Sequence, residues 1–205
     1  MNLLFVGRLL PWKGIHLALK AIAALGPQSK DVHLTIVGSG SDHARLQHLA
    51  RRLGLTESVS WIPWMKREQL FRMYSQFDLF LFPSLHDSGG MAVLEAMSFG
   101  LPVLCLDLGG PAISVDSTCG KVIPTNRRTE EEVVSTISSS LSQLLSDRSL
   151  LEPLSLAAAS RVSSFSWQSA VNSFYRSSSV PAHLQATSST EINPVTAGMG
   201  RSSAR

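Results

Sequence analysis

The sequence contains few of the residues that form disulfides or bind zinc. Of its 205 residues only two are cysteines, Cys105 and Cys119, and no group of cysteines and histidines has zinc-site spacing. Cys105 stands in an apolar run, which favours a buried, reduced thiol over a redox or metal-binding residue. The sequence therefore does not predict a structural zinc domain.

Charged residues are also scarce. They make up 16% of the chain, and the formal net charge is only +3. The doublets Arg51-Arg52 and Arg127-Arg128 do not belong to a long Lys/Arg run and are typical of solvated helix faces. This pattern argues against a nucleic-acid-binding protein, but it tolerates an anionic small ligand.

Long hydrophobic runs are missing as well. No apolar stretch approaches the roughly 18–20 residues that span a bilayer. The first apolar run, residues 2–6, is too short for a signal peptide and is followed by Gly7 and Arg8. We therefore expect a cytoplasmic protein without a transmembrane segment, for which peripheral contact with a membrane stays compatible.

Short apolar runs alternate with segments of helical periodicity through the first 125 residues. Strands are expected over residues 2–6, 32–37, 59–62, 78–82, 102–106 and 120–123. Helices are expected over residues 13–25, 42–54, 66–76, 90–99, 129–147, 148–163 and about 165–175. Strands that are apolar throughout are typical of parallel sheets. The pattern predicts an α/β fold, a Rossmann-like parallel sheet sandwiched by helices.

The composition changes near the C-terminus. Beyond Arg176 the chain consists mainly of Ser, Thr, Ala, Pro and Gly, with little apolar surface to offset the entropy of ordering. We expect one domain over residues 1–176 and a Ser-rich disordered tail over residues 177–205.

Turn residues follow four of the expected strands. They are Gly7-Arg8, Gly38-Ser39-Gly40, Pro83-Ser84 and Gly109-Gly110. Because the carboxyl ends of parallel strands meet at one edge, where ligands bind, these segments should converge on one crevice.

Two cations lie in the first of these segments. Arg8 and Lys13 flank the junction between the first strand and the first helix, where a guanidinium and an ammonium suit a diphosphate. A surface loop with two solvated cations is the alternative. At the second segment, a dinucleotide fingerprint would need a third glycine at position 43, but His43 stands there. A tight turn that shapes the crevice is therefore favoured over an NAD site.

The most informative segment runs from Phe82 to Pro111. Seven residues separate Asp87 from Glu95 in it, and Gly89-Gly90 precedes a helix. Glycines at a helix start let backbone N–H groups approach an anion, and carboxylates accept hydrogen bonds from hydroxyl groups. The alternative is a turn with an exposed acid, followed by a glutamate placed for dipole reasons. Glu95 has apolar neighbours, so it needs a partner, for which a ribose hydroxyl pair is one candidate.

Two further features stay open. His86 precedes Asp87 and is either a ligand contact or a surface histidine. Residues 61–65, an aromatic turn with Trp61 and Trp64, line a nucleobase site or simply pack in the core.

These motifs together resemble the C-terminal, nucleotide-binding half of family-4-type retaining glycosyltransferases, which have the GT-B fold. The resemblance covers residues 2–176, from Gly7-Arg8 and Lys13-Gly14 to Ser166-Trp167. Its strongest part is the acid, seven residues, acid motif from Asp87 to Glu95. The first acid is commonly glutamate in the family, whereas it is aspartate here.

The resemblance implies a role for each motif residue. Arg8 and Lys13 would hold the diphosphate of a UDP- or GDP-sugar, and Asp87 would face the sugar hydroxyls. Glu95 would bind the ribose. The backbone of this site would be contributed by Gly7, Gly89, Gly90, Met91 and Ala92. The family needs no metal, because the cations neutralise the charge.

The resemblance also implies a partner. In this fold the acceptor binds mainly to an N-terminal half, whereas Met1 here directly precedes the first strand of the donor-binding half. Two hypotheses follow: the donor-binding half of an enzyme that pairs with an acceptor-domain polypeptide, or a nucleotide-sugar-binding module without catalysis. An epimerase or phosphorylase relative is a third, less favoured hypothesis.

Overall fold

The computed structural model describes residues 1–165. The expected domain boundary at residue 176 and the tail expected over residues 177–205 lie outside the described residues. The helix expected from about residue 165 to 175 lies almost wholly outside them too.

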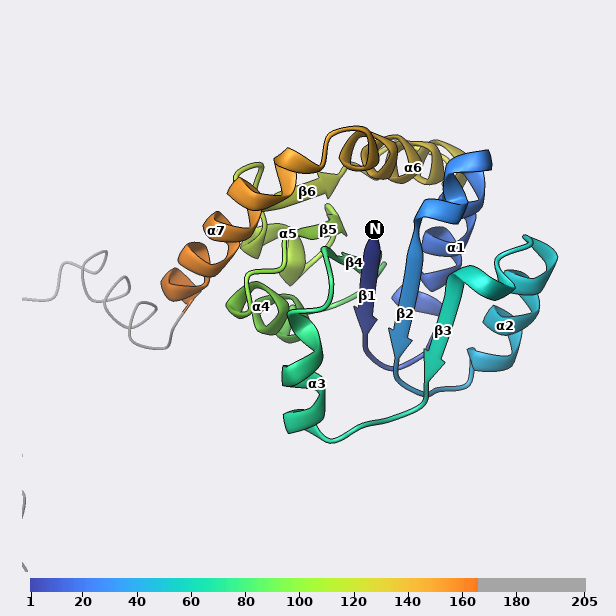
Figure 1. The fold of residues 1–205 in the computed structure, drawn as a ribbon, viewed down its shortest axis with the longest axis horizontal. Helices are drawn as coiled ribbons and strands as arrows, with labels where there is room; N and C mark the ends of the chain where they lie inside the picture. The colour runs from blue at the N-terminus through green and yellow to red at the C-terminus, as the bar shows by residue number, and fades with distance from the viewer. Residues whose placement is uncertain (166–205) are drawn as a thin grey trace, which may run out of the picture. The chain divides into compact units, whose positions relative to one another are not determined.

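Six parallel strands form one sheet in the order β3-β2-β1-β4-β5-β6 (Figure 1). The strands are β1 (Asn2–Val6), β2 (His33–Val37), β3 (Val59–Ile62), β4 (Leu79–Phe82), β5 (Val103–Leu106) and β6 (Gly120–Ile123). In β1, Leu4 is in register with Thr35 of β2 on one side and Phe80 of β4 on the other. The direction of winding reverses between β1 and β4, which is the topological switch point of this strand order.

The central strands explain why helices must cover both faces of the sheet. All four residues of β4 and all four of β5 are buried, so side chains on both faces need apolar cover. Phe82 in β4 stacks on Phe5 of β1, with ring centroids 5.7 Å apart. The core therefore continues across the switch point.

Helices supply this cover (Figure 1). They are α1 (Ile15–Ala24), α2 (His43–Arg52), α3 (Arg67–Tyr74), α4 (Met91–Ser98), α5 (Gly110–Ser114), α6 (Glu130–Ser146) and α7 (Leu151–Val162). α1 packs against α2 and α6, and α4 packs against α5 and α7. The predicted parallel α/β sheet between layers of helices is confirmed.

The predicted element boundaries differ from the observed ones by up to three residues. The first helix begins at Ile15 rather than residue 13, because Gly14 has left-handed backbone angles and ends a short 3-10 turn, η1 (Pro11–Lys13). α5 was not predicted. Its sequence begins with Gly110-Pro111, which suggests a loop, but proline fits the first turn of a helix, where no N–H partner is needed.

Both thiols are buried and free, as predicted for Cys105. Burial, with a smaller contribution from Cys119, raises the pKa of Cys105 to about 12, so this thiol is unreactive at neutral pH. His16 differs from both thiols in being a buried polar group, since its Nδ1 is buried without a hydrogen-bond partner within residues 1–165.

Candidate functional site

Two loops that follow neighbouring strands meet at the switch point. Residues 7–14 follow β1 and residues 83–90 follow β4, and the Leu85 N–H donates to the Trp12 carbonyl oxygen at 2.8 Å. A Cβ atom at Gly14 would lie 1.9 Å from the Pro83 carbonyl oxygen, and Gly14 has φ +66°. Only glycine allows this backbone approach, so Gly14 brings the two loops together.

A second close approach joins the loop after β1 to the turn after β2. A Cβ at Gly38 would lie 1.9 Å from the Gly7 carbonyl oxygen, and one at Gly40 would lie 2.2 Å from the Leu9 carbonyl oxygen. Gly38 and Gly40 therefore let the segment after β2 pack closely on the loop after β1, and its predicted role in shaping a ligand crevice stays a prediction.

One ion pair connects the two loops at the switch point. Lys13 Nζ donates to Asp87 Oδ2 at 2.6 Å, and the two side chains are only 15% and 18% exposed. The ammonium also lies 5.3 Å from the centre of the Phe82 ring. Burial tends to raise the pKa of Asp87, but hydrogen bonds from Lys13, Gly90 and Gly89 together hold it below its usual value. At neutral pH Asp87 is therefore an ionised carboxylate beside Lys13.

The backbone around Asp87 is held by the start of α5 as well as by its own turn. The Gly90 N–H donates to Asp87 Oδ1 at 2.7 Å, and the Gly110 N–H donates to the Asp87 carbonyl oxygen at 3.0 Å. A Cβ at Gly109 would lie 2.1 Å from that carbonyl oxygen. The glycines at 109 and 110 thus let the β5–α5 turn support the loop that carries Asp87.

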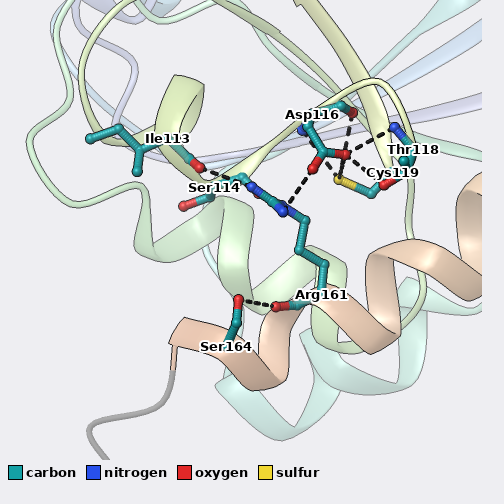
Figure 2. Close-up of polar contacts among 7 residues, drawn as sticks. All are labelled: Ile113, Ser114, Asp116, Thr118, Cys119, Arg161 and Ser164. Carbon is teal, nitrogen blue, oxygen red and sulfur yellow. Dashed lines mark hydrogen bonds and ion pairs between the residues drawn. The ribbon is translucent and has the colours of Figure 1, made fainter. Parts of the chain in front are cut away.

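Arg161 of α7 holds the other end of α5 (Figure 2). Its Nε donates to the Ser114 carbonyl oxygen at 2.6 Å, and its Nη1 lies 2.7 Å from Asp116 Oδ2. A guanidinium can satisfy helix-terminal carbonyls and a carboxylate at once, since its donors are fixed in one plane. α5 is therefore braced at both ends, against the Asp87 loop and against α7.

The other predicted site residues lie at the same edge but make fewer contacts. The Arg8 side chain is exposed and has no hydrogen bond or ion pair within residues 1–165. Gly90 takes left-handed angles as the N-cap of α4, after an exposed Gly89. Met91 is 72% exposed, whereas Ala92 is half-buried, both in the first turn of α4. Their predicted contacts to a ligand stay predictions.

Glu95 has the partners that its apolar setting requires, and both come from α3. Tyr74 Oη donates to Oε1 at 3.0 Å, and Arg67 Nη2 donates to Oε2 at 3.2 Å. Tyr74 and Arg67 were not predicted from the sequence. Both stand on α3, the helix before β4, seven residues apart and so on one helix face, and Glu95 stands on α4, the helix after β4. The proximity of these two helices along the chain is the sequence feature that could have indicated the contact.

The two features left open by the sequence, His86 and the aromatic turn at residues 61–65, are not fully buried. His86 is exposed. Trp61 is half-buried and lies 5.3 Å from His43, ring centre to ring centre, while Trp64 is 73% exposed. Packing in the core therefore does not account for Trp64.

Comparison with known proteins identifies the family. A family model described as "Glycosyl transferases group 1" matches residues 2–161. The chain belongs to this family. The predicted resemblance is thereby confirmed, and so is the GT-B type of fold.

Curated relatives of this glycosyl transferases group 1 chain include two named D-inositol 3-phosphate glycosyltransferase. The one from Mycolicibacterium gilvum is 38% identical over 125 residues, which cover 58% of this chain and 27% of the relative. The one from Nocardia farcinica is 32% identical over 170 residues, which cover 80% and 37%. The chain thus spans about a third of the length of the curated relatives it matches.

Among solved structures, the pneumococcal O-GlcNAc transferase GtfA in complex with UDP and GlcNAc superposes with a TM-score of 0.74. The match covers 85% of this chain and 34% of that one, at 20% identity. At this identity the likeness concerns the fold.

Within residues 1–165, every helix is too short or too polar to span a bilayer. The same residues hold no group of three or more His, Cys, Asp or Glu side chains suited to a metal ion.

Proposed function

We propose that this chain is the donor half of a retaining glycosyltransferase, which holds a nucleoside diphosphate sugar at the carboxyl edge of the sheet. The reaction would transfer a hexosyl group to an acceptor hydroxyl, with the acceptor bound by a further domain. The two relatives are named as glycosyltransferases, and the solved neighbour is an O-GlcNAc transferase whose structure contains UDP and GlcNAc.

The proposal rests on one observation above all. The Lys13–Asp87 ion pair joins the loops after β1 and β4 at the topological switch point, where ligands of open α/β sheets bind. The exposed guanidinium of Arg8 follows β1 at the same edge. Arg8, which has no side-chain partner within residues 1–165, and Lys13, which Asp87 already orients, can share the charge of a diphosphate leaving group.

Each residue then has a chemical task. Arg8 and Lys13 neutralise the diphosphate, which is why no metal ion is required. Asp87, held ionised beside Lys13, accepts hydrogen bonds from sugar hydroxyls. The backbone at Gly89, Gly90, Met91 and Ala92 contacts the sugar and the diphosphate at the start of α4, where the helix dipole favours an anion. Because the Gly89 and Gly90 N–H groups already donate to Asp87, the N–H groups of Met91 and Ala92 are the ones that face the anion. Glu95, one turn further along, accepts from the ribose.

Calorimetric titration tests this proposal. The protein should bind UDP or GDP and the corresponding sugar nucleotide, with an affinity that excess EDTA leaves unchanged. A folded protein that binds none of these ligands would remove the proposal, and an affinity lost with EDTA would remove its metal-independent part.

A second candidate function is a nucleotide-sugar-binding module that catalyses nothing alone. It is compatible with the described site, because the contacts around Lys13 and Asp87 concern the donor alone. A sugar-transfer assay with candidate acceptor-domain chains separates the two. Transfer that needs both chains supports the enzyme, and donor binding without transfer for any partner supports the module.

A further inference from the structure

The carboxylate of Glu95 is held by two residues that differ sharply in burial. Tyr74, whose Oη donates to Oε1 at 3.0 Å, is fully buried, with 0% of its surface exposed. Arg67, whose Nη2 donates to Oε2 at 3.2 Å, has a side chain that is 71% exposed. One carboxylate oxygen is therefore held from the protein interior and the other from the solvent side.

Packing fixes the position of the Tyr74 hydroxyl. Its ring stacks on Phe99, with centroids 4.8 Å apart and planes 6° from parallel, and Phe71 contacts both rings. Phe99 is the C-cap of α4, the helix that carries Glu95. Tyr74 is thus joined to α4 twice, once by its ring and once by its hydroxyl.

The hydroxyl also keeps its proton. Burial, followed by the nearby charge of Glu95, raises the pKa of Tyr74 well above its ordinary value. At neutral pH Tyr74 is therefore a donor, and its hydroxyl is the partner of Glu95 Oε1.

We propose that Tyr74 is a positioning residue for ribose recognition, an inference that rests on the donor-binding role of Glu95 proposed above. The Tyr74 hydroxyl fixes Oε1, so that Oε2 is presented toward the solvent side. Arg67 occupies Oε2 when no nucleotide is bound, and a ribose hydroxyl takes its place. A carboxylate oriented in advance loses less conformational entropy when the ribose binds.

The experiment compares the affinity of UDP and GDP with that of their 2′,3′-dideoxy analogues, in the full chain and in Tyr74→Phe. The variant keeps the ring and removes only the donor, so the fold should survive. We expect nucleotide binding to weaken about 10-fold in Tyr74→Phe, which corresponds to ~1.4 kcal/mol, while binding of the dideoxy analogue stays unchanged.

Two more variants separate positioning from packing. In a Glu95→Gln background, Tyr74→Phe should add little further loss, because both changes remove the same interaction. Ser140→Ala is a matched control. It deletes a half-buried hydroxyl on α6 that donates to the Thr136 carbonyl oxygen, and it should leave both affinities unchanged.

The outcomes distinguish this inference from the function on which it rests. If the folded, unmodified chain binds neither nucleotide, the donor-binding function itself is wrong. If it binds the ribose and dideoxy forms equally well, the ribose role of Glu95 is wrong. If the unmodified chain prefers the ribose form and Tyr74→Phe keeps the full preference, the Tyr74 inference alone is overturned. A loss in Arg67→Ala as large as that in Tyr74→Phe would also overturn it, because Arg67 is expected to leave when the ribose binds.

Discussion

Replacing Gly14 with alanine should cost at least ~3 kcal/mol of folding stability, among the largest effects expected of a single methyl group. The new Cβ would lie 1.9 Å from the Pro83 carbonyl oxygen, and φ at this position is +66°. To relieve the contact, the loops after β1 and β4 would have to separate, and the Lys13–Asp87 ion pair would be disturbed with them. Urea denaturation monitored by circular dichroism measures the loss.

Gly26→Ala and Gly54→Ala are matched controls. Both glycines also have positive φ, +60° and +72°, but a Cβ at either would meet nothing within 4 Å. Each control should lose only the ~1 kcal/mol that a left-handed conformation costs an L-residue. If Gly14→Ala is no less stable than these controls, the close approach of the two loops is wrong.

Lys13→Ala should weaken the binding of a nucleoside diphosphate roughly 10- to 150-fold, the effect of losing a charge-assisted hydrogen bond of ~1.5–3 kcal/mol. Arg8→Ala should weaken it by a similar factor. The two variants should differ in stability, however. Lys13→Ala leaves Asp87 without the ammonium that is 2.6 Å away, whereas the Arg8 side chain has no partner to lose within residues 1–165.

Calorimetry and urea denaturation of both variants check this pair of expectations. Lys20→Ala is the control, because it removes an ion pair with Glu130 in which both side chains are 42% exposed, away from the switch point. It should leave nucleotide affinity unchanged and cost less than ~1 kcal/mol in stability. Unchanged nucleotide affinity in both Arg8→Ala and Lys13→Ala would refute their assigned roles.

Much of the fold could be predicted because its signals are local. Strands such as β4 are apolar throughout, and the helices have clear periodicity, so elements were found within a few residues of their ends. α5 was missed because its glycine and proline suggest a loop. This short helix is held by contacts with residues distant in sequence, namely the loop that carries Asp87 and Arg161 of α7.

The site could be predicted only in part, for a similar reason. Strand order follows from topology rules, so the convergence of Lys13 and Asp87 at one edge was foreseeable. The partners of Glu95 were not, because the contact between α3 and α4 depends on how two helices pack beside β4. Tyr74 resembles an ordinary core aromatic in the sequence, and only its hydroxyl distance to Glu95 distinguishes it.

The most direct test of the central claim is a map of backbone amide NMR shifts during titration with UDP and then GDP. One of the two nucleotides should shift the amides of Gly7 and of residues 89–95. The amides of the residues that line the hollow of about 330 Å³ beside Lys20 and Glu130 should keep their shifts. Shifts confined to that hollow, or no shifts with either nucleotide, would contradict a nucleoside diphosphate site at the carboxyl edge of the sheet.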